Sequence, residues 1–170
     1  MIEVLPDHVA PNLDVIFCGT AVGAMSAARG HYYARPGNRF WRILALTGLT
    51  PRQLCPDEDY LMPSFGLGLT DLAKYVSGQD AQIAMTDYLP TRLFALMAAM
   101  RPRALAFTSL TAARIALQRP RAGMGRLAPD PHLPDDLAIW ALPSPSGLAT
   151  RHFSIGPWQA LADWRNEGGA

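Results

Sequence analysis

A short glycine-bracketed turn is the first segment of the sequence that is typical of a ligand site. The residues GTAVG, 19–23, follow the apolar run LDVIFC and precede a stretch of small residues. Turns of this kind often bind phosphates or nucleotides, but this one lacks the third glycine of G-x-G-x-x-G and the Lys-Ser/Thr pair of a P-loop. Its central residue, Ala21, carries only a methyl group. We therefore expect the turn to shape a pocket whose reactive group comes from another segment.

Two further segments carry polar and aromatic residues suited to the same pocket. They are HYYARPGNRFW, residues 31–41, and LPSPSGLATR, residues 142–151. Metal chemistry is not indicated, because no group of histidines and carboxylates has ligand spacing and the two cysteines are too few for a four-thiolate zinc or iron–sulfur site. The sequence therefore predicts neither a metal nor another cofactor.

Strands and helices are predicted to alternate along the chain. Apolar runs of strand length indicate strands that are covered on both faces. The predicted strands are 13–19, 103–109 and 137–144. Helical spacing of apolar residues and helix-start signals predict helices at 38–48, 90–100, 110–119 and 156–167. Residues 64–75 are predicted to form a glycine-spaced loop that leads into a short helical turn.

This alternation predicts an α/β fold with a mostly parallel sheet and helices on both faces. Ligands of such sheets bind beyond the carboxyl ends of the strands, so the site is expected there. The loops at that edge are 19–38, 64–75, 109–111 and 143–154.

Length and composition indicate one compact domain. The chain has 170 residues, of which 49% are hydrophobic, so we expect a single domain over 1–170, with 1–11 as a candidate flexible N-terminal extension. No apolar stretch approaches the roughly 20 residues of a membrane span. No signal peptide is evident, and the two cysteines fit reduced thiols. We expect a soluble, cytoplasmic monomer without a membrane partner.

The charge balance limits how the chain can bind a polyanion. Fifteen Lys and Arg against fourteen Asp and Glu give a formal net charge of +1. The overall field is therefore too weak to hold nucleic acid. Any such contact must come from a few arginines, helix N-termini and backbone amides.

Taken in order, FCGTAVG, HYYARPGNRFW and LPSPSGLATR resemble three motifs of the mismatch-specific uracil-DNA and thymine-DNA glycosylases, a branch of the uracil-DNA glycosylase superfamily. Members of that branch carry FCG-I-N-P-G, P-x-N-R-F-W and LPNPSGL. The resemblance spans Leu13 to about Trp164. It implies a three-layer α/β/α fold with a central, mostly parallel four-stranded sheet, a DNA substrate that is single- or double-stranded, and no cofactor.

The resemblance implies a base pocket with two departures from the family. Its first motif surrounds an extruded base, which places Gly19, Thr20, Ala21 and Gly23 around the base, but the asparagine that orients water is replaced by Ala21. The aromatic that stacks on the base corresponds to Tyr33. In the third motif the family's asparagine is replaced by Ser144.

The resemblance also implies contacts with DNA. Ser146 and Gly147 match a turn that pinches the DNA backbone, and Leu148 matches an apolar wedge that fills the gap left by the extruded nucleotide. Ser26 and Arg151 are candidate phosphate contacts, although serines here also suit helix caps and an arginine also suits a solvated surface. His152 is a candidate proton donor or phosphate contact.

Because Ala21 cannot act, another group must stabilise the transition state. Cleavage of an N-glycosidic bond develops positive charge on the sugar, and a carboxylate nearby stabilises that charge and can position or deprotonate water. Asp71, in GLGLTDL, is the catalytic candidate, since the resemblance places its loop beside the pocket. A helix N-cap is the structural alternative for this residue.

These inferences favour a monofunctional DNA glycosylase of base excision repair. It would extrude and excise uracil, or another deaminated or mismatched base, by hydrolysis. Two alternatives stay open. A protein that binds damaged or abasic DNA without cleaving it explains the loss of both asparagines, and a nucleotide-binding α/β protein of unrelated chemistry explains the glycine turn alone.

Overall fold

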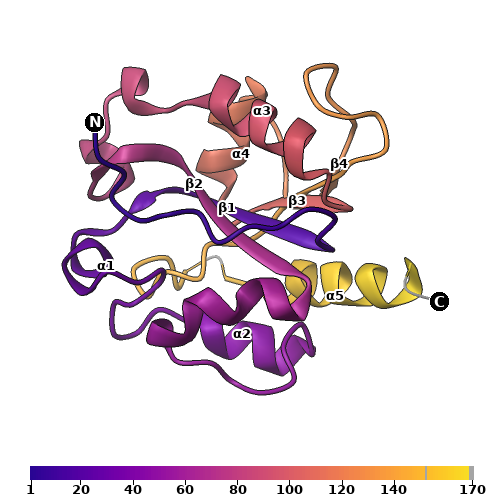
Figure 1. Ribbon diagram of the computed structural model, residues 1–170, viewed down its shortest axis with the longest axis horizontal. Coiled ribbons are helices and arrows are strands. Elements are labelled where there is room, and N and C mark those ends of the chain that lie inside the picture. The colour runs from indigo at the N-terminus through magenta and orange to yellow at the C-terminus, as the bar shows by residue number, and fades with distance from the viewer. Residues whose placement is uncertain (152, 169–170) are drawn as a thin grey trace.

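A five-stranded sheet forms the centre of the protein in a computed structural model that describes residues 1–151 and 153–168 (Figure 1). The strand order is β2-β1-β3-β5-β4, and all neighbouring strands are parallel except β4 and β5. The strands are β1 (Val15–Val22), β2 (Leu67–Ser77), β3 (Ala104–Phe107), β4 (Gly125–Leu127) and β5 (Ala138–Ala141). A mostly parallel sheet is the arrangement predicted from the sequence.

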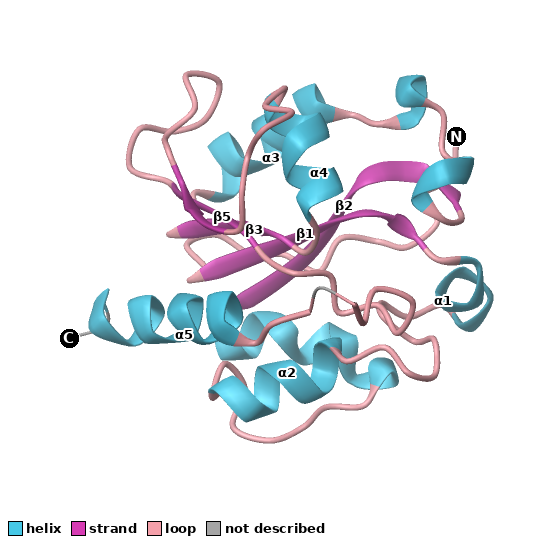
Figure 2. Cartoon of the chain, turned by 180° about the vertical axis from the view of Figure 1, so that it is seen from behind, coloured by secondary structure: helices cyan, strands magenta, loops and turns pink. Residues whose placement is uncertain are grey.

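Helices cover both faces of this sheet. The α-helices are α1 (Ala24–Arg29), α2 (Phe40–Thr47), α3 (Pro90–Met100), α4 (Leu110–Leu117) and α5 (Gly156–Gly168). The 3-10 helices are η1 (Pro56–Phe65), η2 (Asp80–Gln82) and η3 (Met85–Asp87). Figure 2 shows α3 and α4 on one face and α2 and α5 on the other. The three-layer α/β/α architecture is therefore confirmed.

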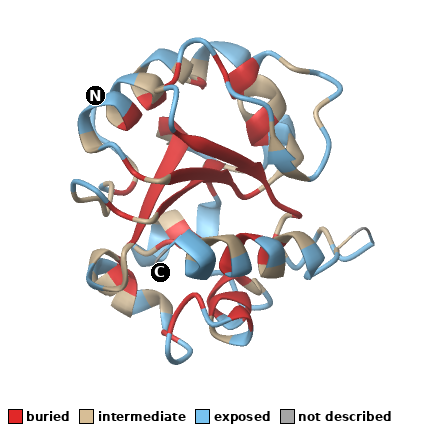
Figure 3. Ribbon diagram, turned by 90° about the vertical axis from the view of Figure 1, so that its right-hand side faces the viewer, coloured by how far each residue is buried: buried red, intermediate tan, exposed pale blue. Residues whose placement is uncertain are grey.

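Strand β1 packs against both helical layers, which explains why its sequence is continuously apolar. Val15 and Phe17 belong to the core on the α2 and α5 side, whereas Ile16 and Cys18 belong to the core on the other side. All four are fully buried. Figure 3 shows the sheet as the buried layer between two partly exposed helical layers. A strand at this position holds the residues that follow it in a fixed place.

The predicted strand number of four is wrong, because β4 adds a short antiparallel edge. None of the predicted strands lies in this part of the chain. β4 is three residues long and begins with Gly125, so it carries no alternating pattern that would identify a strand. It is held by pairing with β5 and by the Arg126 guanidinium, which lies over the rings of Trp140 and Trp164.

The prediction of a loop and a helical turn at 64–75 is also wrong, because these residues form most of β2. Gly66 ends η1 with a φ of 76°, which favours glycine. A Cβ on Gly68 would lie 3.0 Å from the backbone oxygen of His8. The glycine spacing that suggested a loop therefore reflects close approach of another chain segment to a strand.

That segment is the N-terminal one, which runs along the open edge of β2. Val4 N donates to Lys74 O at 2.8 Å, and His8 forms an antiparallel bridge with Leu69. Leu5 is buried. These residues cover the backbone of an edge strand that would otherwise be unpaired. None of the described helices, in 1–151 and 153–168, is long and apolar enough to cross a membrane.

Candidate active site

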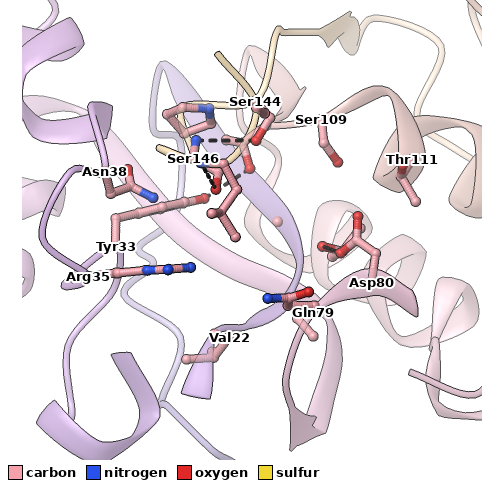
Figure 4. Close-up of a pocket in the computed structure, with 18 of the residues that line it drawn as sticks. Val22, Tyr33, Arg35, Asn38, Gln79, Asp80, Ser109, Thr111, Ser144 and Ser146 are labelled. Atoms are coloured by element: carbon pink, nitrogen blue, oxygen red, sulfur yellow. Dashed lines mark hydrogen bonds between the residues drawn. The ribbon is translucent and has the colours of Figure 1, made fainter. Parts of the chain in front are cut away.

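A cavity of about 730 Å³ opens at the carboxyl ends of the parallel strands. Its walls come from the last residues of β1, from β2 and the segment after it, from the start of α4 and from the loop after β5. The prediction of a turn at 19–23 is wrong for residues 19–22, because β1 continues to Val22 and pairs there with β2. Figure 4 shows side chains from these segments pointing into the same space. Every predicted site residue except Gly147 lines it, namely Gly19, Thr20, Ala21, Gly23, Ser26, Tyr33, Asp71, Ser144, Ser146, Leu148 and Arg151.

Three polar side chains converge at the cavity floor around Gly19. Gly19 lies opposite Asp71 in the parallel pairing of β1 and β2. A Cβ on Gly19 would lie 3.0 Å from Asp71 Oδ1, 3.4 Å from the Tyr33 hydroxyl oxygen and 3.5 Å from Thr108 Oγ1. A side chain at position 19 would therefore require the carboxylate of Asp71 to shift by a few tenths of an ångström.

Asp71 is a buried carboxylate within β2, so the alternative of a helix N-cap is wrong. Its residue is 3% exposed, and its Oδ2 atom has no hydrogen-bond partner among the described residues. Burial raises the pKa of Asp71 to about 7, an effect that the charges of Lys74 and Arg92 oppose. The carboxylate can therefore change its ionisation state near neutral pH, which is a property of many catalytic groups.

Lys74, the only lysine of the chain, supplies a positive charge next to this carboxylate. Its ammonium group is fully buried and donates to Leu5 O at 2.7 Å, to Asp7 Oδ1 at 2.8 Å and to the Tyr32 hydroxyl at 3.2 Å. An ammonium has three donors, so all are used. Asp7 also pairs with Arg92. The N-terminal segment thus contributes the carboxylate of Asp7 to the cluster of charged groups near Asp71.

Tyr33 presents an aromatic ring at the floor. One side of the ring stacks on Phe40, with centroids 3.9 Å apart and an interplanar angle of 20°. Its hydroxyl is 3.0 Å from Thr108 Oγ1, and either oxygen can be the donor. The backbone of Tyr33 has a φ of 52°, which is uncommon for a residue with a side chain. A ring backed on one side is available for stacking on the other.

Asp59, which sequence analysis did not identify, holds the loop that carries Tyr33. This buried carboxylate accepts a hydrogen bond from Tyr32 N at 3.0 Å and lies 3.3 Å from His31 Nδ1 and 3.4 Å from His8 Nε2. The three contacts come from two segments, the loop at 31–32 and the N-terminal segment. No local sequence signal predicts them, because Asp59 lies in η1, far from the loop in the chain.

A second carboxylate, Asp80, was also missed. It is the first residue of η2, immediately after the end of β2, and it lines the cavity. Thr20 Oγ1 donates to Asp80 Oδ1 at 2.6 Å. Because residues 64–75 were not predicted to be a strand, the sequence did not show that the chain after them returns to the carboxyl edge of the sheet.

The loop after β5 is held by its own hydroxyl groups and by hydrogen bonds from Arg39 and Trp158. Ser144 Oγ accepts from Ser146 N at 3.3 Å, and Ser146 Oγ accepts from Leu148 N at 3.2 Å (Figure 4). Leu148 is 62% exposed. Gly147 packs against the segment before α2, because a Cβ there would lie 2.9 Å from Gly37 O. This contact explains why Gly147 alone of the predicted site residues does not line the cavity.

The remaining predicted contacts differ in their surroundings. Ser26 is buried, and its hydroxyl accepts from Ala34 N at 2.9 Å, so it supports the loop that carries Tyr33. Gly23 is the N-cap residue of α1. Arg151 is exposed at the cavity, and His152 lies outside the described residues. Asn38 accepts a hydrogen bond from Phe40 N at 2.9 Å and also lines the cavity.

The fold and the cavity together define an α/β/α protein with a binding site at the carboxyl edge of its sheet, built around a stacking aromatic and a buried carboxylate. The family model described as the Uracil DNA glycosylase superfamily matches residues 6–166, so the chain belongs to this superfamily. This membership supports DNA glycosylase activity and DNA as the substrate.

A solved structure agrees with this assignment at the level of the fold. The chain is similar to a candidate uracil DNA glycosylase from Methanosarcina acetivorans, whose structure was determined by NMR in solution. The TM-score is 0.67 at 20% sequence identity, and the match covers 95% of this chain and 96% of that chain. The two proteins therefore share the whole architecture and few of their residues.

Proposed function

We propose that the protein is a monofunctional DNA glycosylase that hydrolyses the bond between deoxyribose and uracil, with other deaminated or mismatched bases as further substrates. It would act as a cytoplasmic monomer in base excision repair, by extruding the damaged nucleotide from the helix. The observation that carries the proposal is the convergence of Asp71, Tyr33 and Gly19 in one cavity.

The cavity offers the contacts that an extruded base needs. Tyr33, supported from behind by Phe40, provides an aromatic surface for stacking. The backbone of Thr20 and Ala21 and the hydroxyl of Ser144 line the same space and can hydrogen-bond to the edge of the base. Leu148, exposed beside the cavity, is placed to occupy the gap that the base leaves in the duplex.

The proposed reaction uses Asp71 in its ionised form. The N-glycosidic bond breaks, its electron pair leaves with the base, and the sugar develops positive charge that the carboxylate stabilises. A water oxygen then forms the new bond to the sugar carbon, its proton passes to a carboxylate or to solvent, and the base takes up a proton. The products are a free base and an abasic site.

Lys74 supports hydrolysis over a lyase reaction. A lyase step requires an amine that attacks the sugar to form a Schiff base. The only lysine of the chain is fully buried, uses its donors on three protein oxygens and does not line the cavity. Asp71→Asn and wild type should therefore both leave any abasic site uncleaved until alkali is added.

Release of base from uracil-containing single-stranded and mismatched duplex oligonucleotides tests the proposal. We expect wild type to release uracil and Asp71→Asn to be slower by about 10²–10⁴-fold, the usual contribution of a group that acts on protons in the transition state. Asp135→Asn is the matched control, because Asp135 is exposed and does not line the cavity. Activity of wild type should fall as the pH drops through about 7, where Asp71 becomes protonated.

The loss of two family asparagines, at Ala21 and Ser144, favours one competing function. A protein that binds damaged or abasic DNA without cleaving it would bind these oligonucleotides and release no base from any of them. Full activity of Asp71→Asn would have a different meaning. It would leave the glycosylase assignment intact and remove Asp71 from the mechanism.

A further inference from the structure

Asp80 is a cavity carboxylate that the mechanism above does not use. One of its oxygens, Oδ1, is fixed by the 2.6 Å hydrogen bond from Thr20 Oγ1. The other oxygen, Oδ2, accepts no side-chain hydrogen bond in residues 1–151 and 153–168. In contrast to Asp71, Asp80 is exposed. A carboxylate held at one oxygen and open at the other is able to hold a water molecule.

The position of Asp80 relative to the turn strengthens this inference. Its partner Thr20 is the neighbour of Ala21, whose methyl group offers no polar contact to a water molecule. Figure 4 shows Asp80 and Gln79 on the side of the pocket opposite Tyr33 and Arg35. A base stacked on Tyr33 would therefore face the Asp80 side of the cavity.

The charge of Asp80 opposes the binding of DNA. Among the described residues Asp80 forms no ion pair, so its charge is not neutralised within the protein. A negative charge at the mouth of the cavity repels the phosphates of the substrate. If Asp80 had only a structural role, its negative charge would weaken DNA binding without any benefit. In a chemical role the charge is useful during the reaction.

We propose that Asp80, oriented by Thr20, holds the attacking water and accepts its proton, while Asp71 stabilises the charge on the sugar. The proposal rests on the proposed glycosylase function. The water oxygen bonds to the sugar carbon as the N-glycosidic electron pair leaves with the base. The water proton passes to Asp80 and then to solvent, and the base anion takes a proton from solvent. The two carboxylates thus divide tasks that one group would otherwise perform.

Single-turnover kinetics and DNA binding of Asp80→Asn test the proposal. We expect the rate of base release to fall about 100-fold, in the range for loss of a general base. We also expect binding of uracil-containing DNA to tighten by roughly 2- to 5-fold, because a charge that repels phosphate is removed. Asp80→Glu should recover part of the rate, and Asp135→Asn should match wild type in both measurements.

Thr20→Val tests whether the hydrogen bond from Thr20 orients the carboxylate of Asp80 or only attaches η2 to β1. The substitution removes the hydroxyl and keeps the shape of the side chain. We expect a loss of about 10-fold in rate, smaller than that of Asp80→Asn. Equal losses in both variants, accompanied by lower thermal midpoints, would show that the hydrogen bond only fastens η2 to the turn and would overturn the proposal.

Other results distinguish the two levels of inference. Wild-type rates in Asp80→Asn would overturn the role of Asp80 and leave the glycosylase function standing. Absence of base release by wild type from every lesion tested would overturn the glycosylase function and, with it, the role of Asp80. A slower rate with weaker DNA binding in Asp80→Asn would also contradict the proposal, since the charge would then be supporting the complex.

Discussion

The floor of the cavity is made by buried residues that approach one another across the sheet, whereas the loop after β5, residues 143–149, is held by hydrogen bonds within itself and from Arg39 and Trp158. At the floor, Gly19 and Asp71 lie on neighbouring strands and are in close contact. In the loop, Ser144 and Ser146 bond to the backbone two residues further on, and Leu148 is 62% exposed. The floor is thus buried, whereas the loop presents an exposed apolar side chain beside the cavity.

This difference assigns different effects to substitutions in the two regions. A change at the floor alters the ionisation of a buried group and should therefore change the pH dependence of both activity and stability. A change in the exposed loop removes little buried surface and should therefore affect only the complex with DNA. The predictions below test this separation, from the largest expected effect to the smallest.

The largest effect on stability is expected for Asp71→Asn at alkaline pH. The folded-state pKa of Asp71, about 7, exceeds the value of 3.8 expected without burial, so folding favours the protonated form. The free energy of unfolding of wild type should then decrease as the pH rises from about 4 to 7, and stay low above 7. Because Asp71→Asn lacks this ionisation, it should be more stable than wild type by about 2–4 kcal/mol at pH 8.

Urea denaturation of both proteins at pH 5 and pH 8 measures this effect. The difference between variant and wild type should be about 2- to 3-fold larger at pH 8. Asp135→Asn provides the control for the loss of one exposed negative charge. A difference that is the same at both pH values would show that ionisation of the Asp71 carboxyl does not destabilise the fold. The electrostatic difference between the floor and the loop would then be contradicted.

The buried apolar strand and the three motifs were sufficient to predict the fold class and most of the cavity. Gly19, Tyr33 and Ser144 lie where the motifs placed them because each follows or precedes an element with a clear pattern. Asp71 also lines the cavity, although its strand was predicted to be a loop. The loop was predicted from the spacing of Gly66 and Gly68, but glycine occurs at these positions because neighbouring chain segments approach them closely.

The features that the sequence did not reveal depend on contacts between distant residues. The bond between Thr20 and Asp80 spans 60 residues, and that between Asp59 and Tyr32 N spans 27. Burial of Asp71, which determines its pKa, requires the N-terminal segment, α3 and the loop at 31–33 to pack around it. Local patterns predict elements, but they do not predict which polar groups meet at the ends of those elements.

An intermediate effect is expected for Leu148→Ala in the exposed loop. If this side chain fills the gap in the duplex, its loss should slow uracil release from duplex DNA about 10-fold, equivalent to about 1.4 kcal/mol. Release from single-stranded DNA should change by less than about 2-fold, because no stacked partner has to be replaced. Thermal stability should not change, since the side chain is already exposed.

Leu46→Ala is a closely matched control for this experiment. Leu46 lies on α2, is 61% exposed and does not line the cavity, so its loss removes the same group from an unrelated surface. The ratio of duplex to single-strand rates should be the wild-type ratio in Leu46→Ala and lower in Leu148→Ala. Equal ratios in the two variants would show that Leu148 does not fill the gap in the duplex. The loop would then have no role in DNA binding that distinguishes it from the floor.

The smallest effect is expected for Tyr33→Phe, which tests whether the floor acts through the ring or through the hydroxyl of this residue. The substitution keeps the stack on Phe40 and removes the contact with Thr108 Oγ1. We expect a loss of about 1 kcal/mol in the free energy of unfolding, as for one hydrogen bond, and base release within about 3-fold of wild type. Tyr33→Leu, which removes the aromatic surface, should weaken binding of the damaged base much more. A rate for Tyr33→Phe as low as that of Asp71→Asn would instead mean that the hydroxyl takes part in the reaction, because the ring that holds the base is the same in both proteins.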